Sequence, residues 1–195
     1  MHNRWSEFVI ELDSGEADRI NDVVDEIGDM DLEERIELFD VCFDEVTEMY
    51  AEAKDGYIRQ SLVRVAEQLV PGLPTVVALD NDERSVETNG AEVRDQTDAL
   101  CGFLLEAITD DDGRVRQSAK RGLKDISRTY DALDDQDTIE ALVMELDDMA
   151  ADAPDPKAKH LDEAREDIRF SLQSEITRLI EGFQDEFGDS LDMEG

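Results

Sequence analysis

The side chains that usually bind metals or act as nucleophiles are scarce in this chain. Its 195 residues include two histidines (His2 and His160), two cysteines (Cys42 and Cys101), one tryptophan and only five lysines. The histidines form no pair, so the ligand sets of zinc and di-iron sites are missing. A glycine-rich phosphate loop, a nucleophile elbow and a catalytic histidine triad are also missing. These absences count against an enzyme, and we expect no cofactor and no metal.

Long apolar runs are missing as well. No stretch has the length that spanning a bilayer requires, and residues 1–5 lack the apolar core of a signal peptide. Each cysteine stands near a phenylalanine, Phe43 or Phe103, and is predicted to pack as a small hydrophobic residue. We therefore expect a soluble, cytoplasmic protein with no membrane contact.

Acidic residues dominate what is present. Asp and Glu number 53 against 19 Lys and Arg, which gives a net charge of −34. Such a charge repels itself at low salt, whereas at molar salt the Debye length falls to about 3 Å. The apolar residues are periodic, which argues against disorder. The Asp-rich, Lys-poor composition resembles that of haloarchaeal proteins and implies folding in a salty cytosol. A DNA-mimicking or calcium-buffering acidic protein is the alternative.

One ten-residue stretch occurs twice. Residues 55–64 (DGYIRQSLVR) and 112–121 (DGRVRQSAKR) are identical at six positions, and a weaker copy begins at residue 155 (DPKAK). Apolar residues continue each stretch at the spacing of one buried helix face: Ile58, Leu62, Ala66 and Leu69, then Val115, Ala119, Leu123 and Ile126. The sequence therefore predicts an all-α fold with a repeated helical unit.

The pattern Asp-Gly/Pro-x-Val-Arg at the start of each repeated helix resembles that of HEAT-like repeats, including those of phycocyanobilin-lyase-type arrays. The resemblance covers roughly residues 31–170 and implies a short α-solenoid of antiparallel helix pairs. It gives one domain over residues 1–187, with a cap at 1–30 and repeats near 31–70, 93–129 and 136–187. Residues 188–195 are predicted to be a flexible acidic tail. Residues 75–89 interrupt the pattern, and either a small β-hairpin insertion or a short helix with a loop fits them.

The repeated Asp and Arg residues have a structural interpretation. Asp55 and Asp112 stand where a carboxylate can accept hydrogen bonds from the first turn of a helix. Arg59 and Arg116 lie in that first turn, where a cation opposes the helix dipole. We therefore predict that each guanidinium pairs with a carboxylate of the same turn or of the neighbouring repeat. The resemblance likewise implies a structural Asp/Arg ladder along the array.

The second repeated helix carries a stripe of cations. At about 100° per residue, five of them share the side opposite the apolar face, and a sixth stands at the equivalent position of the first repeated helix. We name these residues the basic face: Arg64, Arg114, Lys120, Arg121, Lys124 and Arg128. The resemblance places such helices along the concave surface of a solenoid. Neutralisation of neighbouring acidic helices and binding of an acidic ligand both remain open interpretations.

From these features we expect a non-catalytic scaffold or regulator for protein–protein interactions, which binds an acidic segment of a protein partner. The alternative is a nucleic-acid-binding helical-repeat protein, including a DNA glycosylase-like enzyme, that uses the same basic face. Those glycosylases use aromatic side chains in their groove, whereas Trp5 lies outside the repeats. That position counts against the enzyme.

Overall fold

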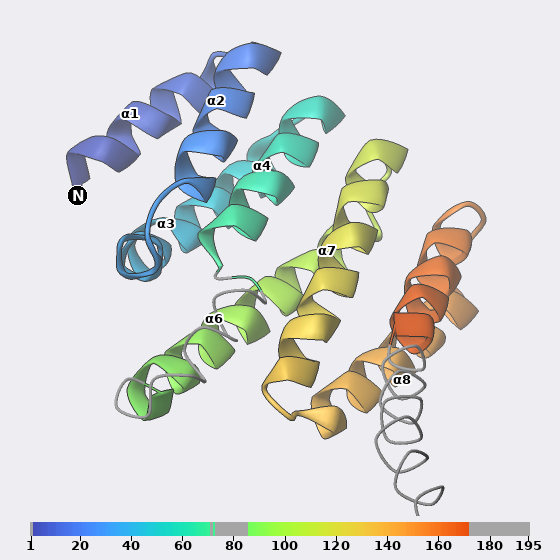
Figure 1. Ribbon diagram of the computed structural model, residues 1–195. Helices are drawn as coiled ribbons and strands as arrows, with labels where there is room; N and C mark the ends of the chain where they lie inside the picture. Colours follow the sequence, from blue (N-terminus) through green and yellow to red (C-terminus); the bar gives the residue numbers. More distant parts are fainter. Residues whose placement is uncertain (1, 71, 73–85, 172–195) are drawn as a thin grey trace, which may run out of the picture.

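The computed structural model describes residues 2–70, 72 and 86–171, and every regular element within them is a helix (Figure 1). No strand occurs in these ranges, so the prediction of an all-α fold is confirmed there. Residues 86–89, for which the sequence left open a β-hairpin or a short helix with a loop, are helical. The rest of that insertion, the end of the third repeat and the acidic tail lie outside the described residues.

The structure describes seven labelled helices. Their bounds are α1 His2–Asp13, α2 Ala17–Gly28, α3 Leu32–Glu52, α4 Gly56–Leu69, α6 Val86–Ala107, α7 Gly113–Ala132 and α8 Gln136–Asp152. Residues 157–171 are also helical. The repeated motifs therefore open α4 and α7, as the sequence predicted.

Aspartate caps start several of these helices. The Asp55 carboxylate accepts a hydrogen bond from the Tyr57 amide at 2.7 Å, and that of Asp112 accepts one from the Arg114 amide at 2.9 Å. Asp31 and Asp135 do the same at the starts of α3 and α8. Each carboxylate satisfies an N–H group that the helix itself cannot pair. The predicted caps at Asp55 and Asp112 are confirmed.

The repeated helices α4 and α7 pack directly on one another, and α2 packs on the other side of α4. Each of the three is also packed against the helix that precedes it: α1 on α2, α3 on α4 and α6 on α7. Figure 1 shows α2, α4, α7 and the helical residues 157–171 succeeding one another across the molecule. The two copies of the motif therefore occupy neighbouring, equivalent positions.

A continuous apolar cluster runs between these helices. Its fully buried members include Ile20, Leu62, Leu104, Leu123 and Leu146, one from each of five helices. Burial of such a side chain contributes roughly 1.5–3 kcal/mol. Both cysteines are buried, and burial raises the pKa of each thiol to about 12. The sequence interpretation of the cysteines as packing residues therefore fits their environment.

The third motif shifts its apolar register by one residue. Leu161, Ala164 and Ile168 are buried in the helical residues 157–171, while the Asp162 side chain is about half exposed.

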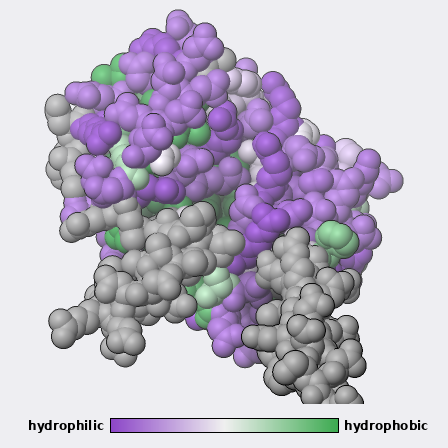
Figure 2. All heavy atoms as spheres, in the orientation of Figure 1, coloured by the Kyte–Doolittle hydropathy of each residue, from purple (hydrophilic) through white to green (hydrophobic). Residues whose placement is uncertain are grey.

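The face visible in Figure 2 is mainly hydrophilic. Among the described helices, none combines the length and apolarity that a membrane crossing needs.

Candidate functional site

The first repeated arginine forms a bidentate ion pair with the next repeat. Arg59 donates from Nε to Asp110 Oδ2 at 2.7 Å and from Nη2 to Oδ1 at 2.9 Å. The Asp110 carboxylate also accepts hydrogen bonds from the Tyr50 hydroxyl and the Asp112 amide, each at 2.7 Å. Burial raises the pKa of Asp110, but its hydrogen bonds, led by that from Arg59, outweigh burial and leave the pKa lowered. The predicted pairing of Arg59 is confirmed, with a carboxylate that the sequence motif does not contain.

The second repeated arginine departs from the prediction. Arg116 is 6% exposed, and its Nη1 donates to the carbonyl oxygens of Asp110 (2.7 Å) and Asp111 (2.9 Å). Within the described part of the chain it forms no ion pair with a carboxylate, and its buried Nε has no acceptor. The expectation that Arg116 pairs like Arg59 is therefore wrong for these residues. At position 153, which corresponds to Asp110 of the previous repeat, the sequence has an alanine in place of the aspartate.

The basic face extends along α7 and onto α4. Arg114 and Arg128 are 14 residues apart, which corresponds to about 21 Å along a helix. Four of its cations contact an acceptor: Arg64 donates to Asn21 Oδ1 (2.5 Å), Arg114 pairs with Asp112 (2.7 Å), Lys120 with Glu163 (2.8 Å) and Arg128 with Asp125 (3.2 Å). These four cations therefore neutralise or position neighbouring side chains.

Arg121 and Lys124 differ from the other four. No described residue forms a hydrogen bond or an ion pair within 4 Å with either cation. Arg121 is exposed and Lys124 is half-buried. They stand three residues apart, so they lie on the same side of the helix, one turn from each other. The part of the basic face that can accept a new anionic group is therefore the middle of α7.

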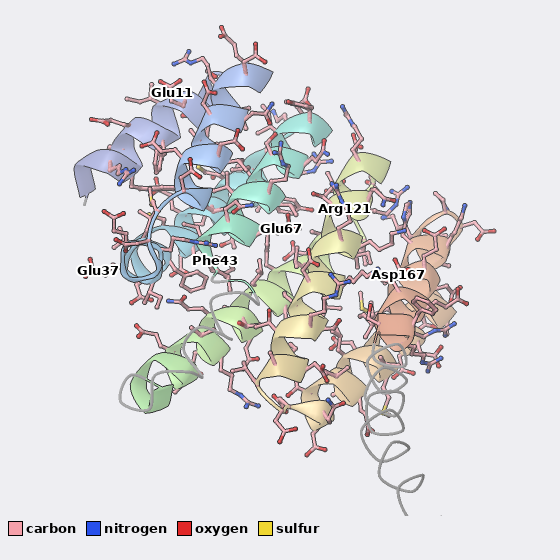
Figure 3. All side chains as sticks on the ribbon, viewed as in Figure 1. Glu11, Glu37, Phe43, Glu67, Arg121 and Asp167 are labelled. Carbon is pink, nitrogen blue, oxygen red and sulfur yellow. The ribbon has the colours of Figure 1, made fainter. Side chains whose placement is uncertain are left out.

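Sequence analysis missed a further acidic residue that lies beside the basic face. Glu67 of α4 sits beside α7, where Figure 3 shows it near Arg121. Its Oε1 atom is buried without a hydrogen-bond donor among the described residues. A side chain on Gly122 would collide with this carboxylate and would approach Leu104 Cδ1 to 2.7 Å. The available sequence signal was a glycine in the middle of a helix with no turn to explain it.

Burial is the main cause of an unusual pKa at Glu67. Burial and, to a smaller extent, Asp125 raise this pKa, whereas Arg121 and Arg64 lower it, and the net result is a rise from 4.5 to about 7. Two cations of the basic face are thus close enough to act on one carboxylate. These two arginines stand at equivalent positions of the two repeated helices.

We expect the Glu67→Gln variant to be more stable than the wild type at pH 8, by about 3 kcal/mol. The folded pKa lies above the unfolded value, so ionisation costs stability progressively as the pH rises from about 4.5 to 7. Glutamine removes this cost, and its advantage is expected to shrink as the pH falls to 5. Urea unfolding at fixed KCl concentration, repeated from pH 5 to 8, measures the difference. An advantage independent of pH would contradict the assignment of the titrating group.

Further chemistry is not apparent in the described residues. No group of three or more His, Cys, Asp or Glu side chains there is arranged to hold a metal ion. A depression of about 420 Å³ lies between the Arg59–Asp110 pair and Lys157. Its charged groups are already paired, Arg59 with Asp110 and Lys157 with Asp111.

Comparison with known protein families, with curated proteins and with solved structures finds no match to this chain.

Proposed function

We propose that this protein is a non-catalytic interaction scaffold that binds an acidic segment of a protein partner through its basic face. We further propose that its helix pairs form a short HEAT-like α-solenoid adapted to high salt. The packing of α2, α4 and α7 in sequence, each with its preceding helix, supports this architecture. Repetition of the capping Asp and of the following Arg at equivalent sites supports it as well.

The observation that carries the functional proposal is the uneven pairing of the basic face. In a chain with 53 acidic residues, a cation on a helix has many opportunities to pair. Arg121 and Lys124 nevertheless lack a partner within the described residues, although their neighbours Lys120 and Arg128 have one. A carboxylate from another chain would meet a planar guanidinium and an ammonium at one place.

A peptide of alternating Asp and Glu, with an Asn/Gln peptide of equal length as its control, tests this proposal. We expect the Arg121→Glu/Lys124→Glu variant to bind the acidic peptide about 30-fold more weakly than the wild type, a loss of about 2 kcal/mol. Because Arg121 also acts on the buried Glu67 carboxylate, its reversal is expected to lower the melting temperature, and both proteins are therefore compared at a temperature at which each is folded. Isothermal titration calorimetry at 1 M KCl measures the affinity.

A matched control carries the same charge change elsewhere. The Arg4→Glu/Lys54→Glu variant alters a half-buried residue of α1 that pairs with Glu26 and Glu34, and an exposed turn residue. It lies away from the basic face and is expected to bind the peptide like the wild type. Equal weakening of both variants would show a general charge effect and would contradict a specific face. A single-stranded oligonucleotide is the third ligand. Tighter binding of the oligonucleotide than of the peptide would replace the protein partner by a nucleic acid.

A further inference from the structure

Arg59 and Arg116 each donate a hydrogen bond from Nη1 to a backbone carbonyl oxygen. Nη1 of Arg59 donates to the carbonyl oxygen of Ala53 at 3.0 Å, and Nη1 of Arg116 donates to that of Asp110 at 2.7 Å. In both cases the acceptor stands six residues before the arginine. This shared contact fixes each guanidinium against the turn that opens its own helix. The two sites can therefore be compared atom by atom.

The other edge of the guanidinium distinguishes the two sites. For Arg59, Nε and Nη2 donate in parallel to the Asp110 carboxylate of the next repeat, which is the usual bidentate geometry of an arginine–carboxylate pair. Asp110 stands two residues before the capping aspartate Asp112, and the equivalent position before Asp155 is Ala153. The position that supplies the carboxylate to Arg59 therefore carries only a methyl group in the repeat that follows Arg116.

The surroundings of Arg116 make a lone cation there costly. The residue is only 6% exposed, and its Nε is buried without an acceptor among the described residues. An arginine stays charged at any physiological pH, and a buried charge without a counter-ion is strongly unfavourable. His160 lies close enough for Arg116 to lower its pKa, after the larger effect of burial, and His160 Nδ1 is also buried without a partner. Arg116 Nε and His160 Nδ1 therefore both lack a hydrogen-bond partner within the described ranges.

We propose that the Nε/Nη2 edge of Arg116 is a binding site for a small free carboxylate, such as formate or acetate. The ligand takes the place that the Asp110 side chain occupies against Arg59. A small planar anion suits the site because the low exposure of Arg116 leaves little room for a bulky group. The two oxygens of a carboxylate match the two parallel N–H donors of the guanidinium edge. This site is separate from the proposed contact with an acidic protein segment.

The Ala153→Asp variant tests the proposal by supplying the carboxylate within the chain. At a constant 2 M potassium concentration, chloride is replaced stepwise by formate and the melting temperature is recorded. We expect a saturable rise for the wild type, as binding to the folded state requires. The variant is expected to melt higher than the wild type in chloride alone and to lose the saturable rise. Any general effect of formate on stability remains in both proteins and cancels in the comparison.

Proton NMR of the two histidines gives a second readout that does not depend on the variant folding. An anion bound at Arg116 is expected to raise the pKa of His160 and to shift its ring signals saturably with formate. His2, in the first turn of α1, serves as the internal reference. If formate moved the His160 and His2 signals equally in the wild type, the carboxylate site would be refuted. Equal formate responses of the wild type and a folded Ala153→Asp variant would refute it as well.

Discussion

The melting temperature is expected to rise by about 20 °C between dilute buffer and 3 M KCl, which corresponds to about 6 kcal/mol at about 3 °C per kcal/mol. The cause is the net charge of −34, which remains because 19 cations cannot neutralise 53 carboxylates. Many of those cations are already engaged in ion pairs such as Arg59–Asp110 and Lys120–Glu163. The remaining repulsion between carboxylates falls away once the Debye length is only a few ångströms. Circular dichroism at 222 nm, recorded over a series of KCl concentrations, measures the melting temperature.

A charge-reduced variant provides the control for this salt effect. Glu145, Asp148 and Asp152 are exposed acidic residues on one side of α8. Their joint replacement by lysine lowers the net negative charge by six. We expect the variant to melt higher than the wild type in dilute buffer and to gain less from KCl. A wild-type melting temperature that stays constant or falls as KCl increases would contradict the adaptation to high salt.

The Asp110→Ala variant is expected to lose about 3–5 kcal/mol of stability, the usual cost of removing one partner of a buried ion pair. The Asp110 side chain is 7% exposed and that of Arg59 is 18% exposed, so water can replace little of the lost interaction. The Tyr50 hydroxyl and the Asp112 amide lose their acceptor at the same time. Urea unfolding in 3 M KCl, where general repulsion is screened, measures the loss.

Asp111, the residue next to Asp110, provides a matched control. Asp111 pairs with Lys157 at 2.7 Å, but the Asp111 side chain is 92% exposed. The Asp111→Ala variant is expected to lose far less stability than the Asp110→Ala variant, because exposed ion pairs contribute little. Equal losses in the two variants would mean that the Arg59–Asp110 pair does not join the repeats as described. Because the pKa of Asp110 is lowered in the folded state, the stabilisation from this pair is expected to disappear as the pH falls through that pKa.

Local features of the fold could be predicted from the sequence because they depend on residues close together in the chain. Helical spacing of apolar residues identified α4 and α7, and the Asp-Gly start identified their caps. Asp110 could not be predicted as the partner of Arg59, because it stands 51 residues away. Only the packing of α4 on α7 brings the two together. The start of α6 at Val86 was missed because residues 86–92 interrupt the apolar spacing that marks α4 and α7.

The candidate site was predictable only in part, for the same physical reason. The basic face could be located by aligning Arg64 with Arg121, because the face depends on helix geometry alone. The alignment could not show which cations are already paired. For example, Lys120 pairs with Glu163, which lies 43 residues away in the chain. Glu67 was missed because its raised pKa comes from burial against α7, which the composition of α4 does not reveal. Arg121 and Lys124 differ from the other four cations of the basic face through contacts between repeats, which the motif itself does not reveal.

Affinity capture from an extract of the source cells in 3 M KCl tests the proposed function most directly. The wild type, the Arg121→Glu/Lys124→Glu variant and the Arg4→Glu/Lys54→Glu control are compared, with chemical crosslinking and mass spectrometry to locate the contact. The account predicts a protein that the wild type and the control retain and the first variant loses, crosslinked beside Arg121 through a segment rich in Asp and Glu. Retention of the same proteins by all three folded baits, or crosslinks that lie away from α4 and α7, would contradict it.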